Sequence, residues 1–242
     1  MGLLVVAATI AVFAPASLVD ARVASISRGT LRIADAQGTL WRGHGVLTPP
    51  DGRWRVPVEW TLRPLPLLGG ATSIELTVPE GAAQGVRGRI ELRASRALAD
   101  SLVVRVPATA VTSMSGPSAL QPGGDLELSS DALELAPTGS SGSVAAHWRN
   151  ARLVGAGLPV LDFGTLTAKL TMRGNALAGP VTSQGGMVLV SGNVSVGAER
   201  IAADLRLLPD ASAPPELHKA LATFGPVDAS GAILVRVDRS TR

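Results

Sequence analysis

The sequence predicts an all-β fold of mainly antiparallel strands, arranged either as a strongly curved meander sheet or as a two-layer sandwich. Through most of the chain, apolar residues recur at every second position, which is the spacing of half-buried strands. Glycine- and proline-rich turns separate these segments, and such short turns join antiparallel rather than parallel neighbours. Helical patterns near the two ends add an N-terminal membrane helix and one short C-terminal helix.

The N-terminal segment is the longest apolar stretch of the chain. Residues 2–19 carry no charge, and a helix needs about 20 apolar residues to cross a bilayer. The sequence therefore predicts a transmembrane helix over 1–20, an uncleaved signal anchor, followed by a single domain over 21–242. A cleaved signal peptide is an alternative, although no positive residue precedes Leu3. A buried core helix is a third interpretation.

Immediately after this segment, the spacing of Val19, Val23 and Ile26 predicts a short amphipathic helix with these three residues on one face. Beyond it the apolar pattern changes from a period of 3.6 to a period of two. Segments with this alternation occur at 74–78, 89–93, 125–128, 133–135, 165–172, 201–207 and 233–237. Turn signals occur at 69–70, 122–124, 139–142, 185–186 and 192–193. An antiparallel meander is the expected result.

One segment near the C-terminus departs from the strand pattern. Pro214 and Pro215 occupy the favoured start of a helix, and Gly225 follows its last turn. The apolar residues between them recur at i, i+3, i+4 and i+7, which predicts a short amphipathic helix packed on the sheet. These residues are Leu217, Ala220, Leu221 and Phe224.

The residues that usually carry chemistry are sparse. The chain has no cysteine, which excludes disulfides and thiolate metal sites. His44, His147 and His218 stand in three separate segments, without a second ligand at metal-binding spacing. Asp125 and Glu127 share a strand face and could bind a cation, but a solvated strand face shows the same alternation. We therefore expect no catalytic residue, no metal site and no cofactor.

The distribution of charged residues indicates whether the chain could bind nucleic acid. The formal net charge is +3 and the arginines are scattered singly, with no tyrosine and only 3% aromatic residues. Proteins that bind nucleic acids usually combine a basic stripe with stacking aromatic side chains. Nucleic acid is therefore excluded as a partner.

The tryptophans mark motifs that are spread along the chain. Trp41, Trp54, Trp60 and Trp148 lie within or beside strand patterns, where large amphipathic rings cover a sheet. The first three lie close to the apolar N-terminal segment, so anchoring at a membrane interface is an alternative role.

Three motifs together resemble a known family. Gly38, Leu40, Trp41 and Gly43 form a G-x-L-W-x-G element. Trp60 and Pro64 form a W-x-L-x-P strand, and Trp148 follows Gly142 in a G-x-V-x-x-x-W-x-x-A strand. With the closing segment 214–231 in the same order, the chain resembles the type II secretion system protein N family.

The resemblance implies a non-catalytic accessory component of the bacterial type II secretion machinery. It implies a cell inner-membrane protein with a single span and the bulk of the chain in the periplasm. Its partners would be other inner-membrane components of the type II secretion system, and its role would be protein export across the outer membrane through protein–protein contacts. Arg22, Arg28 and Arg32 follow the span, and the positive-inside rule alone would place the body in the cytoplasm.

A second function stays open. A long antiparallel sheet with one continuous apolar face could form a groove for acyl chains, a pattern similar to envelope proteins of the AsmA/TamB type. Lipid would then be a partner. The deciding observation is whether the apolar face is covered by a second layer of the same chain or left as an open groove.

Overall fold

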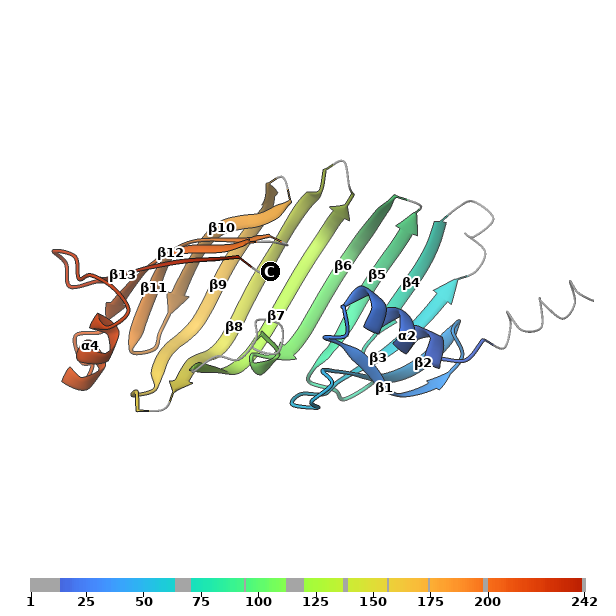
Figure 1. Cartoon of the computed structure of the whole chain (residues 1–242), viewed down its shortest axis with the longest axis horizontal. Helices are drawn as coiled ribbons and strands as arrows, with labels where there is room; N and C mark the ends of the chain where they lie inside the picture. The colour runs from blue at the N-terminus through green and yellow to red at the C-terminus, as the bar shows by residue number, and fades with distance from the viewer. Residues whose placement is uncertain are drawn as a thin grey trace, which may run out of the picture. The chain divides into compact units, whose positions relative to one another are not determined.

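The computed structural model of the chain describes residues 14–63, 71–93, 95–111, 120–136, 139–155, 157–173, 175–197 and 200–240. It divides into two compact units, an N-terminal unit (Met1–Arg105) and a C-terminal unit (Val106–Arg242). Within each unit the strands follow one another in chain order, β1 to β6 in the first unit and β7 to β13 in the second, and each is hydrogen-bonded to its neighbours in that unit (Figure 1).

The N-terminal unit consists of one helix and a meander of strands. Its elements are α2 (Ser17–Ile26), β1 (Arg32–Gly38), β2 (Arg42–Thr48), β3 (Val56–Arg63), β4 (Ala71–Thr77), β5 (Gly85–Arg93) and β6 (Arg96–Pro107), which ends just past the unit boundary.

The C-terminal unit contains the longer strands and a second helix. Its elements are β7 (Leu120–Leu135), β8 (Ser141–Gly155), β9 (Leu161–Arg173), β10 (Ala176–Gln184), β11 (Val188–Gly197), β12 (Arg200–Pro209), α4 (Pro215–Ala222) and β13 (Ile233–Ser240).

The expected fold class is confirmed at the level of mainly antiparallel β with strands in meander order. The finer expectations, strong curvature or a two-layer sandwich, are wrong. Within each unit the strands form one layer that is not strongly curled (Figure 1). The reason is that each strand pairs with its neighbours in the chain, so the described strands build no second sheet. The single domain expected over 21–242 stays a prediction.

Two expected turns are strand interiors. Residues 122–124 lie within β7, where Gly124 has a φ of +100° and the register with β8 shifts. Gly192 lies within β11 opposite Leu205 of β12. In both places glycine allows close approach of the neighbouring backbone rather than a chain reversal. The expected turn at 185–186 is confirmed, because these residues join β10 to β11.

The predicted membrane helix over 1–20 falls mostly on residues 1–13, outside the described part of the chain. Of its last residues, Pro15 forms an isolated bridge with Thr39, and Val19 belongs to α2. Among the residues that the structure describes, neither helix has the length and apolar character to span a bilayer.

The amphipathic helix predicted after this segment is α2, but its apolar face is narrower than expected. Val19 and Val23 pack against a cluster formed by Ala16, Ile33 and Trp60. Ile26, predicted on the same face, is 72% exposed. It is the last residue of the helix, beyond the part that lies on the cluster.

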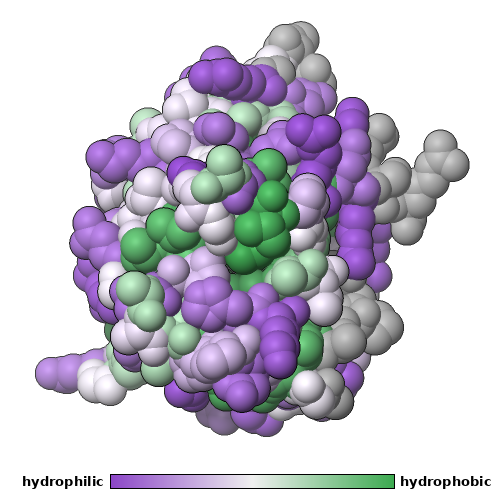
Figure 2. All heavy atoms as spheres, turned by 90° about the vertical axis from the view of Figure 1, so that its left-hand side faces the viewer, coloured by the Kyte–Doolittle hydropathy of each residue, from purple (hydrophilic) through white to green (hydrophobic). Residues whose placement is uncertain are grey.

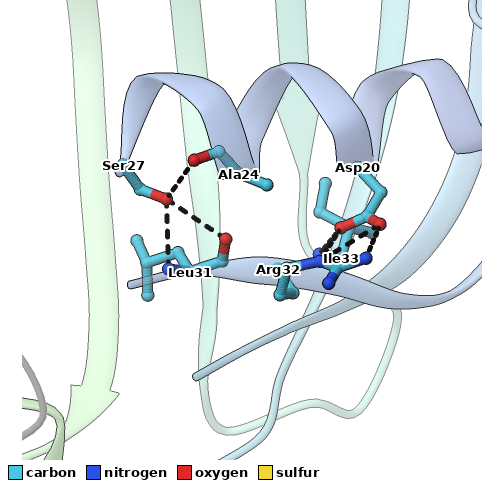
Figure 3. A network of polar contacts seen from close by, with 6 residues as sticks. All are labelled: Asp20, Ala24, Ser27, Leu31, Arg32 and Ile33. Carbon is cyan, nitrogen blue, oxygen red and sulfur yellow. Dashed lines mark hydrogen bonds and ion pairs between the residues drawn. The ribbon is translucent and has the colours of Figure 1, made fainter. Parts of the chain in front are cut away.

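Polar contacts fix both ends of α2 to the chain that follows it (Figure 3). Arg32 Nη2 donates to Asp20 Oδ2 at 2.7 Å, and the backbone N–H of Ile33 donates to Asp20 Oδ1 at 2.8 Å. The Arg32 guanidinium lowers the pKa of the Asp20 carboxyl below its usual value, with the Ile33 N–H acting in the same direction. At the other end, the Leu31 N–H donates to the Ser27 hydroxyl oxygen at 3.1 Å.

The core of the C-terminal unit lies between α4 and the adjacent strand ends. Leu217 and Leu221 of α4 are 2% and 0% exposed, and they pack with Val188 and Ile233. Pro215 starts the helix, as the sequence predicts, and Phe224 packs partly buried against the same cluster. The predicted C-terminal helix is therefore confirmed, together with its packing role.

Candidate functional site

The first sequence motif is a tight hairpin between β1 and β2. Gly38 pairs with Gly43, and Gly43 pairs with Trp60 on β3. A Cβ at Gly43 would lie 2.5 Å from Trp60 Cζ2, so only glycine leaves room for the indole ring there. Gly38 has a φ of +94°, and a Cβ at this position would lie 2.5 Å from the Arg42 carbonyl oxygen. Gly43 therefore leaves room for the ring of Trp60, which is 4% exposed, while Gly38 allows the tight hairpin.

The residues between the two glycines bind neighbouring backbone. The Leu40 N–H donates to the carbonyl oxygen of Ala14 at 2.7 Å, and the Leu62 N–H donates to that of Trp41 at 2.6 Å. Trp60 Nε1 donates to the Thr39 carbonyl at 3.3 Å. This part of the motif is structural, because it ties three segments of the N-terminal unit together. Pro64 lies outside the described residues.

Trp148, the last motif residue, lies in the C-terminal unit and is not brought together with the others by any described contact. It pairs with Leu126 of β7, and its Nε1 donates to the Gly123 carbonyl at 2.9 Å. Its ring packs against the core cluster of the C-terminal unit and lines the cavity described next.

The C-terminal unit has two chemically distinct faces. On one face the register aligns apolar residues across the strands, for example Trp148 with Leu166 and Leu205 with Val235. We call the hollow on this face the apolar trough. In Figure 2 hydrophobic side chains gather in a hollow at the centre of the face shown, with hydrophilic ones around it.

The apolar trough has a volume of about 440 Å³. This lies within the range of about 300–1,000 Å³ that is usual for small-molecule sites. All of its lining residues except Thr167 are apolar. They are Leu120, Leu126, Ala146, Trp148, Leu153, Leu161, Phe163, Leu166, Thr167, Ala168, Val181, Val190, Val194, Leu205, Leu207, Phe224, Val235 and Val237.

The two ends of the trough differ. At one end, α4 packs its buried leucines against Leu161, Val188 and Ile233 and closes the space. At the other end, Val196 is 43% exposed. Arg239 of β13 pairs with Ile201 at this open end. By strand alternation Arg239 stands on the trough side, in line with Val235 and Val237.

The opposite face of the same strands is polar and ion-paired. Arg149 Nη2 lies 3.2 Å from Glu127 Oε2, and Arg236 Nε lies 2.6 Å from Asp204 Oδ1. Asp125 also pairs in register with Arg149. The two acidic residues considered as a cation site therefore face an arginine, and this is the arrangement of a solvated strand face.

The histidines lie apart in the structure. His44 is exposed on β2, His147 is exposed on β8, and His218 is exposed on α4 with its Nδ1 3.2 Å from the Pro214 carbonyl. Within the described residues, no group of three or more histidine, aspartate or glutamate side chains is placed to hold a metal ion.

The last strand of the C-terminal unit is an edge. The segment before it covers the start of this edge, because Val227 forms a bridge with Ile233 and the Leu234 N–H donates to the Pro226 carbonyl at 2.9 Å. By alternation, the N–H and C=O groups of Arg236 and Asp238 also point away from β12. No strand in the described part of the chain pairs with this outer edge.

Sequence reasoning missed several strands that build the trough. β10 and β11 carry Val181, Val190 and Val194 into the lining, yet glycine, serine and proline interrupt their alternation. Arg239 was missed as well. Its place two residues after Val237, on the apolar side of an alternating strand, is the signal that could have identified it.

Comparison with known protein families gives a match over most of the chain. The model of the family described as "Type II secretion system (T2SS), protein N" matches residues 29–236. Neither a curated protein nor a solved structure matches the chain. The matched range takes in every described motif residue and extends from the turn between α2 and β1 into β13.

Proposed function

Because this chain belongs to the type II secretion system protein N family, a non-catalytic component of the secretion apparatus in the bacterial envelope, we propose that it is an inner-membrane accessory component acting through protein–protein contacts. The N-terminal apolar segment anchors it, and the body lies in the periplasm. Its task is to dock other inner-membrane components of the same system during export across the outer membrane.

The observation that carries this proposal is the outer edge of β13. An unpaired strand edge presents main-chain donors and acceptors to which a partner strand can add. Arg236 and Asp238 supply these groups, whereas Pro226 and Val227 already cover the first residues of the strand. A partner strand paired with β13 would place its own apolar side chains on the same face as those of β13.

The test is a substitution that blocks the edge without breaking the sheet. Proline at position 236 removes an outward N–H and leaves the register with β12 intact, because the groups of Arg236 point away from that strand. We expect Arg236→Pro to abolish co-purification of the full chain with the other inner-membrane secretion components in mild detergent. Arg236→Ala is the matched control, since it also removes the ion pair with Asp204.

The outcomes separate clearly. Loss of partners with Arg236→Pro and their retention with Arg236→Ala would support edge docking. Equal retention by both variants would exclude β13 as the docking edge. Failure of the unsubstituted chain to retain any secretion component would reject the docking role itself.

The topology has its own test. In spheroplasts, a protease added from outside should digest the body and leave the N-terminal segment with the membrane fraction. Protection of the body until the membrane is lysed would reject the periplasmic placement.

A further inference from the structure

We propose that the apolar trough of the C-terminal unit holds one acyl chain of an anionic membrane phospholipid, with Arg239 beside the phosphate at the open end. This goes beyond the docking role, and it rests on different residues.

The lining excludes most polar occupants. Apart from Thr167, the trough is lined by apolar residues from β7 to β13 and by Phe224. A peptide strand lying there would bury main-chain N–H and C=O groups without partners, at a cost that apolar contacts do not offset. A hydrocarbon chain has no such groups. Its burial removes apolar surface of both the ligand and the trough from water.

No second layer of the described chain covers this face. The core cluster around α4 closes one end, with Leu221 and Val188 fully buried. The hollow between Trp148 and Val235 remains open, although it is as apolar as a core. An exposed hollow of this kind, framed by polar residues, marks a binding groove rather than an unfinished core.

The positive charge at the open end of the apolar trough favours a lipid with an anionic headgroup. Among the described residues of β8 to β13 that stand on the trough side, Arg239 alone is charged. It lies two residues beyond Val237, or about 7 Å along the strand. The neighbouring acid, Asp238, stands on the opposite face and is paired with Arg200. A guanidinium at the open end complements the phosphate of an amphiphile whose tail lies in the trough.

Trp148 provides a direct optical test. The full chain is reconstituted into phosphatidylglycerol vesicles whose acyl chains carry bromine, a quencher of tryptophan fluorescence. We expect the bromine to quench part of the emission, and we expect Trp148→Phe to remove that quenched part. Because the other tryptophans lie in the N-terminal unit, the difference between the two proteins reports on the trough. An unchanged quenched fraction in the Trp148→Phe protein would overturn the proposal.

A matched pair of substitutions tests occupancy. Ala146 lines the trough, whereas Ala145 pairs with Lys169 on the polar face. In native mass spectrometry of the detergent-purified chain, Ala146→Phe should displace bound phospholipid, and Ala145→Phe should retain it. Equal lipid content in both variants would reject the site. A lipid-free dimer that becomes monomeric with Ala146→Phe would also reject it, by showing a second copy in the trough.

Two graded effects complete the test. Each methylene removed from the acyl chain of a lysophosphatidylglycerol probe should weaken binding about fourfold, as expected for a fully buried tail. Arg239→Gln should remove the preference for phosphatidylglycerol over phosphatidylcholine and leave the chain-length dependence unchanged. Binding that is insensitive to chain length would contradict burial of the tail. A headgroup preference that persists in Arg239→Gln would contradict the assigned role of the arginine.

Discussion

At the scale of single residues, close packing of glycine against tryptophan explains the first sequence motif. Gly43 lies under Trp60, and Gly38 adopts a backbone conformation that other residues rarely reach. The indole nitrogen then binds the Thr39 carbonyl within the same hairpin. The motif therefore stabilises the N-terminal unit and places no reactive group.

Substituting Gly43 tests this interpretation. In Gly43→Ala the new methyl group would meet Trp60 and the Gln37 carbonyl oxygen, both at 2.5 Å. We expect a loss of about 1–3 kcal/mol in unfolding free energy, the usual cost of overpacking. Urea denaturation followed by tryptophan fluorescence measures it. In the control Gly197→Ala the nearest atom would lie at 3.5 Å, an ordinary contact, so the expected change is below about 0.5 kcal/mol. Equal effects of the two substitutions would contradict the close packing of Gly43 against Trp60.

At the scale of elements, the two short helices pack on the strands, and the strands form the apolar and the polar faces. α2 is held to β1 by the Asp20–Arg32 pair and by the Ile33 N–H. α4 closes one end of the apolar trough through Leu217 and Leu221. Apolar residues recur at helical spacing in both segments, but only α4 buries such residues, whereas α2 has none that is fully buried.

The attachment of α2 predicts a pH effect. The pKa of Asp20 is lowered in the folded chain, so its contribution to stability is present above the unfolded pKa of about 3.9. That contribution is lost as the pH falls through the lower, folded-state value. Asp20→Asn should lower the unfolding free energy at pH 7 by about 1 kcal/mol. It should also lose less stability than the unsubstituted chain on going to pH 3.

Denaturant titrations at the two pH values measure this difference. The double variant Asp20→Asn with Arg32→Gln controls for the pair, and it should cost little more than either single change. Additive costs would contradict a direct interaction between the two side chains.

At the scale of the whole molecule, the strands separate an apolar side from an ion-paired side in the C-terminal unit. The arginines in the described pairs are mostly half or more exposed, for example 54% for Arg149 and 84% for Arg236. Such pairs contribute roughly 0–1 kcal/mol each, since water already solvates their charges. The stability of the fold therefore depends mainly on apolar packing and main-chain hydrogen bonds.

Salt should accordingly have a small effect on stability. Raising sodium chloride from about 0.1 M to 1 M shortens the Debye length from about 10 Å to 3 Å. We expect the unfolding free energy to change by less than about 2 kcal/mol, because exposed pairs contribute little. Urea titrations at both salt concentrations measure it. A loss of twice that size would show that the ion pairs are a principal source of stability.

The sequence by itself determined the strand-rich class, the antiparallel order and the C-terminal helix, because alternation and helix-start residues are local properties. It also led to the family, through Gly38, Leu40, Trp41, Gly43, Trp60 and Trp148 in order. It misread Gly124 and Gly192 as turns, because glycine permits a bulge or a close approach as readily as a chain reversal.

Only the tertiary structure decided which surfaces remain open. Alternation shows that a strand has an apolar face, but it cannot show whether another layer covers that face. Coverage depends on contacts between residues far apart in the chain, such as those of Leu221 with Val188. The same long-range register brings Trp148, Val190 and Val235 around one hollow and places Arg239 at its open end. The apolar trough and the outer edge of β13 are therefore properties of the folded chain, which no local pattern specifies.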